Sequence, residues 1–420
     1  MQTNNKTLAW LEQKTESRFV FGLERMHAAL DFFNIKDTST HVQILGTNGK
    51  GSTIEFLKDI LMHHHKKVAV YTSPHLFSLY DRFKINNESI SEDLFLNYLS
   101  RLFDAEKNQL IPELSYFEIT TLLAYLYFSE QNVDYMLIEA GLGGRLDATT
   151  ALPYSHVLFT SIDYDHQAYL GDSLQSIAYE KFSVIQSHHQ VFSLDQDTEA
   201  LHELKKIIQQ TKATLYLENQ DFFLSNHNHL ISFILTNNFH IKTIELSLHG
   251  EHQFHNALLA TQAAKVLLNN AFNSKTVKQS LKKTLNPGRY QKIIQDQTTF
   301  IFDVAHNLQS FTSLMKTSKN DDPDIDVYCL SMLDDKPWQL ILSELIQYKK
   351  PIVLCMTESL RAWKQEHVLD WIKHNDHDHL IQFYKDFKHG LDYIQNHYKK
   401  CLIFGSFFFV GPCIEYLDSK

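Results

Sequence analysis

The sequence predicts an α/β protein of two domains, a larger one built on a mostly parallel sheet and a smaller Rossmann-like one after it. Three observations lead to this prediction. Short apolar runs alternate with amphipathic stretches along most of the 420 residues, as in parallel sheets whose strands are joined by helices. A glycine-rich segment at 46–51 separates an apolar run from an amphipathic stretch. The alternation then restarts after the turn signal Asn-Pro-Gly at 286–288.

The elements expected before residue 288 follow from the spacing of their apolar residues. Buried strands are predicted at 41–45, 67–72, 134–139 and 155–161. Helices are predicted at 51–63, 92–104, 117–131, 253–269 and 274–284. Between 214 and 248 the pattern changes to short strands with polar turns, which predicts an antiparallel addition at a sheet edge.

After residue 288 the sequence again alternates between short apolar runs and amphipathic stretches. These elements are expected at 299–303, 308–316, 325–332, 337–347, 351–355, 366–373, 386–396 and 401–404. We therefore predict domains at 1–288 and 289–420. The second has about 130 residues, a common domain size.

Composition and charge exclude several classes of protein. The formal net charge of -10 argues against a nucleic-acid-binding protein, which usually carries a basic face. No apolar run approaches the ~20 residues that span a bilayer, and the first residues lack the apolar core of a signal peptide. The 4 cysteines have no C-x-x-C spacing and are expected to be buried thiols in a reducing compartment. We expect a cytoplasmic protein that binds neither membranes nor nucleic acid.

The segment 43–53 has the features of a phosphate-binding loop between a strand and a helix. Glycines let backbone N–H groups turn onto phosphate oxygens, and the helix N-terminus adds positive potential. In such a loop Lys50 reaches the β- and γ-phosphates, and the Ser52 hydroxyl binds Mg²⁺. The strict Walker pattern fails, because Ile44 and Gly51 stand where it has glycine and Ser or Thr. A tight turn without a ligand is therefore an alternative.

The loop 46–52 resembles that of the Mur ligase superfamily, most closely its folylpolyglutamate synthase/dihydrofolate synthase branch. Further segments resemble this branch in the order in which it shows them, at 21–25, 71–76, 81–86, 114–118, 139–149, 163–166, 170–171, 180–181, 250–257, 287–289 and 303–307. Only 45 residues precede Gly46, which is too few for the nucleotide-sugar-binding domain of the peptidoglycan branch. The chain is identified on these grounds as a folate-type member.

The resemblance implies an ATP-dependent ligase that joins L-glutamate to a folate through an acyl phosphate. It implies a P-loop, Mur-ligase-like catalytic domain that binds ATP at 1–288 and a Rossmann-like glutamate-ligase domain at 289–420. The substrates implied are ATP, L-glutamate and a reduced folate, and we expect a monomer. Asp147 and the segment 115–118 favour additional activity on dihydropteroate. A folylpolyglutamate synthase alone is the alternative.

The resemblance also implies two Mg²⁺ sites, which suit hard oxygen ligands at the carboxyl ends of strands. Ser52, Ser73 and Glu139 are expected to hold the first ion, and Glu139 and His166 to help hold the second. Lys181 resembles a lysine that carries a carbamate and then binds the second ion. Ser73 as a turn former and Lys181 as an ordinary surface lysine remain alternatives. The residues that follow, Phe182 and Ser183, depart from the family pattern.

Catalytic roles are implied for Lys50, Glu139, His166, Lys181 and Arg289. The ATP-binding residues implied are Asn48, Gly49, Lys50, Gly51, Ser52, Asn256, Arg289 and Asp303, with Asn256 on the adenine side. Arg289 follows a hinge glycine, where a plain salt bridge is the alternative role. His306 resembles a residue that orients glutamate. Val304 replaces a glycine of the family pattern, so the backbone conformation at this position can differ from that of the family.

The folate side is expected to be formed by three short segments. They contain Gly22, Leu23 and Glu24; Ser115, Tyr116, Phe117 and Glu118; and Leu146, Asp147 and Ala148. Phe117 can stack on a flat heterocycle and Asp147 can accept hydrogen bonds from its N–H groups. A core position is an equal alternative for Phe117, because Phe117, Thr121, Ala124 and Phe128 form an apolar stripe.

Two other classes of function remain open at the level of sequence. A P-loop switch or motor hydrolyses ATP without an acceptor carboxylate or glutamate, whereas a ligase needs both. A degenerate, non-catalytic relative is favoured by Phe182, Val304 and Thr150, the last standing where the family usually has Asn. Against it, the residues expected to hold phosphate and metal are all present.

Overall fold

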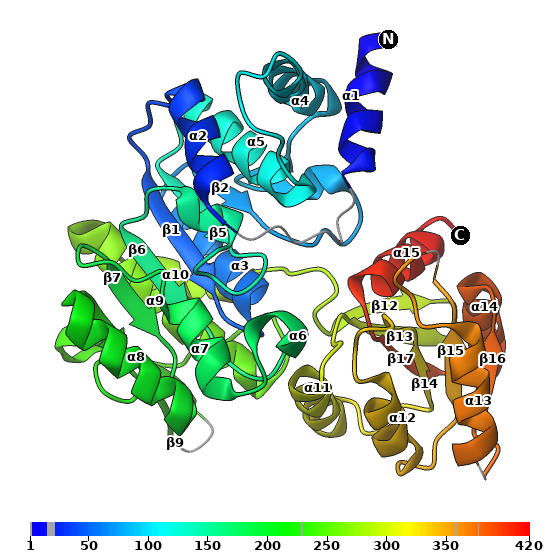
Figure 1. The fold of residues 1–420 in the computed structure, drawn as a ribbon. Helices are drawn as coiled ribbons and strands as arrows, with labels where there is room; N and C mark the ends of the chain where they lie inside the picture. The colour runs from blue at the N-terminus through cyan, green and yellow to red at the C-terminus, as the bar shows by residue number, and fades with distance from the viewer. Residues whose placement is uncertain (1, 15–21, 228–229, 358, 377) are drawn as a thin grey trace. The chain divides into compact units, whose positions relative to one another are not determined.

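The computed structural model describes residues 2–14, 22–227, 230–357, 359–376 and 378–420, and its chain divides into two units, each with its own central sheet (Figure 1). The first unit contains residues 1–74, 78–247 and 253–284. The second contains residues 75–77, 248–252 and 285–420. The α/β fold class predicted from the sequence is confirmed.

The first unit is built on an 8-stranded sheet with the order β4-β3-β2-β5-β1-β6-β7-β8. Six neighbouring strands are parallel, and a short antiparallel hairpin, β3 and β4, extends one edge. The strands are β1 (Thr40–Leu45), β2 (Val68–Tyr71), β3 (Phe83–Ile85), β4 (Glu88–Ser89), β5 (Tyr135–Glu139), β6 (His156–Phe159), β7 (Gln190–Ser193) and β8 (Thr214–Leu217).

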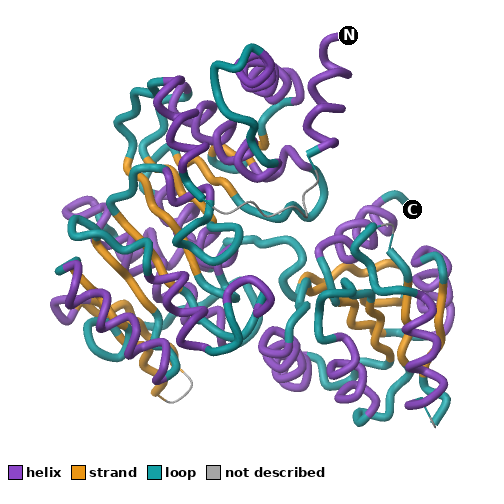
Figure 2. Tube along the Cα trace, in the orientation of Figure 1, coloured by secondary structure: helices purple, strands orange, loops and turns teal. Residues whose placement is uncertain are grey.

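Helices cover both faces of this sheet, which is why its central strands β1, β2 and β5 are buried along almost their whole length and are mostly apolar (Figure 2). The side chains of α4 and α5 pack on β2 and β5, and those of α7 and α8 pack on β6 and β7. The helices of the first unit are α1 (Gln2–Gln13), α2 (Glu24–Phe33), α3 (Lys50–His63), α4 (Glu92–Lys107), α5 (Tyr116–Glu130), α6 (Gln167–Leu170), α7 (Leu174–Phe182), α8 (Thr198–Thr211), α9 (Glu251–Leu268, whose first two residues lie in the second unit) and α10 (Ser274–Leu281).

The expectation for residues 214–248 was wrong in its arrangement. The first strand of the region, β8, continues the large sheet in parallel with β7. The antiparallel strands β9 (Phe223–His227), β10 (Leu230–Leu235) and β11 (Phe239–Ile241) form a separate 3-stranded sheet. The pattern of short strands and polar turns identified the antiparallel pairing, but it carries no information about the sheet that a strand joins.

The second unit contains a 6-stranded sheet with the order β12-β13-β17-β14-β15-β16, parallel except for β12. Its strands are β12 (Gln291–Gln295), β13 (Thr298–Asp303), β14 (Val327–Leu330), β15 (Ile352–Cys355), β16 (Ile381–Tyr384) and β17 (Lys400–Phe404). Its helices are α11 (Leu308–Asp321), α12 (Trp338–Ile346), α13 (Gln365–Asn375), α14 (Phe387–His397) and α15 (Phe407–Asp418). Because β17, the last strand of the chain, lies between β13 and β14, the order in which strands are added to the sheet reverses, and the carboxyl edge of such a sheet commonly holds ligands.

All 4 cysteines are free and buried, as predicted, and they belong to one core cluster: three stand on strands of the second sheet and Cys413 on α15. Within the residues that the structure describes, the helices fall short of the length and apolarity that crossing a bilayer requires.

A pH-dependent stability follows from two histidines beside β6 and β7. Burial lowers the pKa of His189 to about 4, helped by the charges of His188 and His156, and lowers the pKa of His156 to about 4. His189 is 3% exposed and its Nδ1 accepts a hydrogen bond from the Gln186 N–H. Since both folded-state values lie below the unfolded value of 6.5, the unfolded chain binds more protons between pH 6.5 and 4.

We expect the free energy of unfolding to fall as the pH drops through that window, with roughly 2–3 kcal/mol attributable to His189. Denaturant unfolding at several pH values checks this. His189→Gln, which keeps an acceptor but does not titrate, should show a smaller loss. A loss equal to that of the wild type would contradict the assignment to His189.

Candidate active site

Hydrogen bonds from the Lys50 side chain to two carbonyl groups hold the conformation of the loop between β1 and α3. The Lys50 Nζ donates to Gly46 O at 3.2 Å and to Thr47 O at 3.2 Å. The Thr47 hydroxyl donates to Asp163 O at 3.0 Å, which ties the loop to the segment after β6. In this position the lysine ammonium stands at the N-terminus of a helix of 14 residues, where a phosphate also finds backbone N–H donors.

Two glycines of this loop have no room for a side chain. Gly46 has φ +144° and a Cβ there would lie 1.9 Å from the Thr160 Oγ1. Gly49 has φ +89° and a Cβ there would lie 2.5 Å from the Asn256 Oδ1. Asn256, on α9, is 4% exposed and so packs directly on the loop. Ser52 is buried in the first turn of α3, next to Gly51.

Glu139 and Ser73 meet at the carboxyl ends of β5 and β2. The Ser73 N–H donates to the Glu139 Oε2 at 3.2 Å, and the Glu139 Oε1 lies 3.9 Å from the Lys50 Nζ. Since β2, β5 and β1 are neighbours, Ser73, Glu139 and Ser52 follow three adjacent strand ends. Among the described residues, no three His, Cys, Asp or Glu side chains gather into a metal site of their own. A carboxylate with two serine hydroxyls is nevertheless an oxygen donor set of the kind that suits Mg²⁺.

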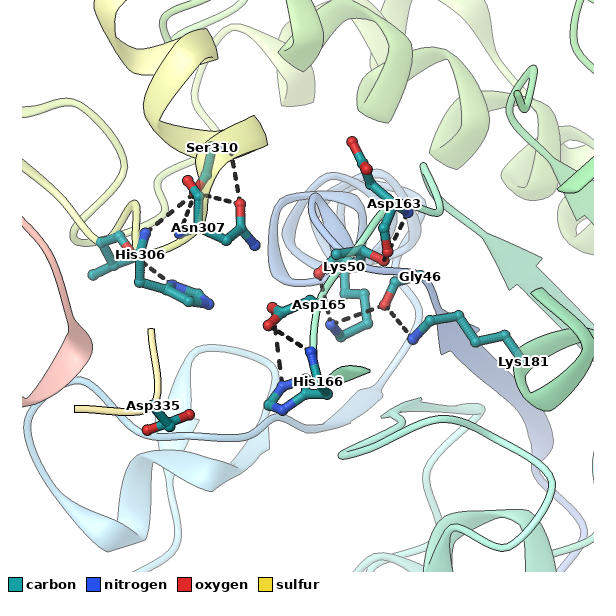
Figure 3. A network of polar contacts seen from close by, with 12 residues as sticks. Gly46, Lys50, Asp163, Asp165, His166, Lys181, His306, Asn307, Ser310 and Asp335 are labelled. Carbon is teal, nitrogen blue, oxygen red and sulfur yellow. Dashed lines mark hydrogen bonds and ion pairs between the residues drawn. The ribbon is translucent and has the colours of Figure 1, made fainter. Parts of the chain in front are cut away.

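Lys181 reaches the same carbonyl group as Lys50. Its Nζ donates to Gly46 O at 3.1 Å, and Figure 3 shows the two lysines approaching Gly46 from different sides. Lys181 is 6% exposed. Burial, and then the charge of Lys50, lower the pKa of Lys181 to about 7. It is thus a buried amine with a substantial neutral fraction near neutral pH, unlike a surface lysine.

The residues after Lys181 leave it in place although they depart from the family pattern. Phe182 is fully buried, with its ring 4.7 Å from that of Phe159 in an edge-to-face arrangement. Ser183 ends the helix, and its hydroxyl donates to Tyr179 O at 2.6 Å.

His166 lies beside an acidic residue that sequence reasoning did not single out. His166 has φ +54° and precedes α6, and its Nε2 lies 3.9 Å from the Asp165 Oδ2. Figure 3 places Asp165 and His166 on the side of Lys50 away from Lys181. The negative charge of Asp165 opposes the lowering of the Lys181 pKa. The order Asp-Tyr-Asp-His after a buried strand was the signal that could have identified Asp165.

Phe117 and Glu118, expected on the folate side, have clear structural contacts. A Cβ at Gly141 would lie 2.5 Å from the Phe117 ring, so the ring rests on the backbone of the loop after β5. Glu118 is 2% exposed, completes a capping box with Ser115 at the start of α5, and pairs with Arg25 of α2 at 2.9 Å. Its carboxylate therefore fastens α2 to α5.

Asp147 uses its carboxylate within its own loop. One oxygen accepts hydrogen bonds from the Gly141 and Leu142 N–H groups, at 3.1 and 2.8 Å. The other accepts from the Thr149 N–H and hydroxyl, at 3.0 and 2.5 Å. Burial raises the pKa of Asp147 against these hydrogen bonds. The structure thus gives this residue a role in holding the loop, and a contact with substrate stays a prediction.

The remaining folate-side residues lie in or beside loops of the first unit. Gly22 and Leu23 precede α2, Glu24 begins it with an exposed side chain, and Phe21 of the same motif lies outside the described residues. Tyr116 begins α5 under the guanidinium of the buried Arg82, at 5.5 Å. Leu146 is half-buried, and Ala148 belongs to the core over α5.

The second unit gathers its predicted residues at the carboxyl end of β13. Asp303 accepts hydrogen bonds from the Tyr290 and Ala305 N–H groups, at 3.0 and 2.9 Å. Burial raises the pKa of Asp303, and the charge of Arg289 lowers it. The Arg289 guanidinium lies 5.5 Å from the centre of the Phe407 ring.

The His306 ring lies on the same aromatic side chain, with its centre 6.3 Å from that of Phe407. Its Nδ1–H donates to Val304 O at 2.9 Å, and the next residue, Asn307, caps α11 in a capping box with Ser310 (Figure 3). Val304 is fully buried in the core and does not have positive φ, so its side chain replaces the family glycine without strain.

Ser406 is a further candidate that sequence reasoning missed. It is 2% exposed, precedes the 12-residue helix α15, and its hydroxyl has no hydrogen-bond partner and does not cap the helix. An unsatisfied buried hydroxyl is costly, so its persistence at a helix N-terminus is typical of a ligand contact. The signal was present in the sequence as an apolar strand followed by Gly405-Ser406 and a helix, the order that the first loop also shows.

Comparison with known proteins shows what this site is similar to. A family model described as "Mur ligase middle domain" matches residues 44–264. The dihydrofolate synthase/folylpolyglutamate synthase of Buchnera aphidicola subsp. Schizaphis graminum is 30% identical over 330 residues, 77% of this chain and 75% of that protein. The folylpolyglutamate synthase of Arabidopsis thaliana is 31% identical over 255 residues, 58% of this chain but 42% of that protein. The structure of E. coli FolC in complex with DHPP and ADP superimposes with a TM-score of 0.88 at 26% identity, covering 99% of this chain and 98% of that chain.

The contact between Gly46 and Thr160 gives a direct test of the loop. Gly46→Ala should lower affinity for a nucleotide by about tenfold or more, because the new methyl group collides with the Thr160 hydroxyl and the backbone must leave φ +144°. Titration with a fluorescent nucleotide measures this. The double variant with Thr160→Ala should recover part of the affinity but not all, since it relieves only the collision. Wild-type affinity in Gly46→Ala would show that the loop geometry does not matter for binding.

Proposed function

Since the chain belongs to the Mur ligase family, and within it to the dihydrofolate synthase/folylpolyglutamate synthase enzymes, we propose that it joins L-glutamate to folates at the expense of ATP. Enzymes of this family are ATP-dependent acid–amino-acid ligases. The observation that carries the proposal is the meeting of Lys50, Glu139 and Lys181 at the loop after β1, inside the region that matches the family.

The reaction needs the acceptor carboxylate to become a better leaving group. Transfer of the γ-phosphoryl group of ATP to this carboxylate gives an acyl phosphate and ADP, and attack by the amino group of glutamate then gives an amide and phosphate. Lys50 is placed to meet the charge on the transferring phosphoryl group, and the backbone of the 46–51 loop with the N-terminus of α3 is placed to bind the phosphates.

Ser52, Ser73 and Glu139 are proposed to hold one Mg²⁺, and Glu139, His166 and a carbamylated Lys181 a second. Bound Mg²⁺ neutralises phosphate charge and orients the γ-phosphate. The support is the oxygen donor set at three adjacent strand ends and the 3.2 Å hydrogen bond that orients the Glu139 carboxylate.

The carbamate proposal for Lys181 rests on its surroundings. A neutral amine attacks CO₂ to form N–COO⁻ with loss of one proton, and the lowered pKa of Lys181 supplies the neutral amine. The product replaces a cation, which lies beside the cation of Lys50, with an anion that has oxygen donors for a metal.

The second unit is proposed to supply contacts to ATP and glutamate. Arg289 and Asp303 are assigned to ATP, with the arginine charge directed to the phosphates. His306 is assigned to glutamate, and the unsatisfied Ser406 hydroxyl at the start of α15 supports an additional contact to a glutamate carboxylate. In this proposal residues 1–288 hold the phosphate loop and the metal ligands, and residues 289–420 bind glutamate and add Arg289 and Asp303 to the ATP site.

Both reduced folate and dihydropteroate are proposed as acceptors. The Buchnera relative carries both activities in its name, and E. coli FolC was solved with DHPP and ADP. Phe117, half-buried beside the loop after β5, is proposed to contact the acceptor ring. A monofunctional folylpolyglutamate synthase is the alternative. We further propose a monomer in the cytoplasm, where the 4 free buried thiols are stable.

ADP release measured with dihydropteroate or tetrahydrofolate, each with L-glutamate, tests the function directly. We expect Lys50→Ala and Glu139→Ala to reduce turnover by ~100-fold or more, because each removes a charge that acts on the phosphoryl group. Both variants should keep the wild-type melting curve. Turnover that persists without acceptor or glutamate would instead indicate an ATPase, and near wild-type turnover in either variant would show that its role is wrong.

Carbamylation of Lys181 is tested by removing CO₂, the reactant that forms the carbamate. Activity should fall when dissolved CO₂ is stripped at mildly acidic pH, where less of the amine is neutral, and should recover with bicarbonate. Lys181→Ala should be inactive and partly rescued by a short carboxylate such as formate. Full activity in CO₂-free buffer, together with electron density for an unmodified Lys181 side chain in a crystal structure, would contradict the proposal.

A further inference from the structure

Gln43 is a fully buried polar residue in the middle of β1 that the proposed chemistry does not use. Its Cα is paired with those of Ile138 on β5 and Val157 on β6, so it stands at the centre of the sheet. Its Nε2 donates to the hydroxyls of Thr149 at 3.1 Å and Thr150 at 2.9 Å, more than 100 residues further along the chain. Its Oε1 is buried without a partner. An apolar residue would avoid this cost, so the amide is kept for its donors.

The two threonine hydroxyls pass these hydrogen bonds on to the loop after β5. Thr150 donates its proton to Gly144 O at 2.7 Å, and Thr149 donates to the Asp147 carboxylate at 2.5 Å. Asp147 in turn accepts from the Gly141 and Leu142 N–H groups, two and three residues after Glu139.

The same loop also touches the end of α7. A Cβ at Gly144 would lie 2.9 Å from Glu180 O and 3.0 Å from Lys181 O, and the Arg145 N–H donates to Glu180 O at 2.8 Å. The loop 140–150 thus lies between the strand that leads into Gly46 and the helix that carries Lys181. Its position helps to set the distance between Glu139, Lys181 and the phosphate loop.

The donor and acceptor in each of these hydrogen bonds determine which side chain suits position 43. A threonine hydroxyl has one proton, and Thr149 and Thr150 donate theirs to Asp147 and to Gly144 O. Toward position 43 each hydroxyl can therefore only accept a hydrogen bond. A carboxamide provides two N–H groups. A carboxylate of the same shape provides none and would face two acceptors.

We propose that Gln43 is a positioning residue for ligation: through Thr149 and Thr150 it holds the 140–150 loop, and thereby Glu139 and Lys181, in register with the phosphate loop. Thr150, which replaces the usual asparagine of the family, is one half of this arrangement. The inference rests on the proposed function for its kinetic effect, while the network itself can be tested without turnover.

Two variants of position 43 test whether the N–H donors of the Gln43 side chain matter, rather than its size and shape. Gln43→Leu and Gln43→Glu should each lower kcat by roughly 10- to 100-fold, as loss of a residue that orients a metal ligand does, with a smaller change in KM for ATP. Exchange of the 141–147 backbone amides with deuterium should become faster in both. Gln262→Leu is the matched control, because Gln262 is equally buried and also donates to a threonine hydroxyl, Thr236, but lies in the middle of α9.

Position 150 gives a second test if the Gln43 variants fail to fold. Thr150→Val removes the hydroxyl and should lower kcat as Gln43→Leu does, and combining the two should cost little more than either alone. Thr150→Asn restores an acceptor for Gln43 and a donor for Gly144 O, and should stay close to the wild type.

The inference is overturned if Thr150→Val or Gln43→Leu keeps wild-type kcat well below its melting temperature. It is also overturned if Gln262→Leu loses as much activity for the same loss of stability, or if amide exchange at 141–147 is unchanged in Gln43→Leu. A wild-type protein that does not ligate glutamate would refute the proposed function instead, and amide exchange would still decide the role of Gln43.

Discussion

Two lysine side chains donate to one carbonyl oxygen, Gly46 O, and the rest of the site is arranged around this contact. Two ammonium groups that share an acceptor repel each other, and burial adds to the cost of charging Lys181. The loop therefore concentrates positive potential at the end of β1 and favours an anion there. A triphosphate bound at the loop would offset this repulsion, and a carbamate in place of the Lys181 ammonium would remove it. Nucleotide binding and the proposed modification therefore both lower the cost of placing two lysines at Gly46.

The order of strands in the sheet explains why the polar residues around this loop are far apart in the sequence but close together in the fold. The strands β2, β5, β1 and β6 are parallel neighbours, so their carboxyl ends meet at one edge. Glu139 is the last residue of β5, and Ser73, Gly46 and Asp163 each follow one of the other strands within four residues. Right-handed crossover connections make this arrangement the usual one for a parallel sheet, and each connecting helix also closes part of the core.

The sequence predicted the strands of this edge to within about two residues, because apolar runs between polar turns are a local signal. The phosphate loop was predicted for the same reason. The hairpin of β3 and β4 and the parallel placement of β8 were not, since neither depends on local pattern alone. Among site residues, Asp147 and Glu118 are predicted to contact substrate, and nothing in the sequence indicated that their carboxylates also hold a loop and a helix cap. Gln43 was not noticed, because its partners are more than 100 residues away and nothing near it in the chain marks it.

Three departures from the family pattern had favoured a non-catalytic relative, and the structure gives each a compensating contact. Phe182 packs edge-to-face against Phe159 in the core. Val304 fills the core of the second unit in an ordinary backbone conformation. Thr150 receives a hydrogen bond from Gln43 and passes its own proton to Gly144 O. None of the three replaces a residue that is proposed to bind phosphate, metal or acceptor, and each has a neighbour that suits its side chain. The three departures therefore do not favour a non-catalytic relative over a ligase, because the local packing accommodates each of them.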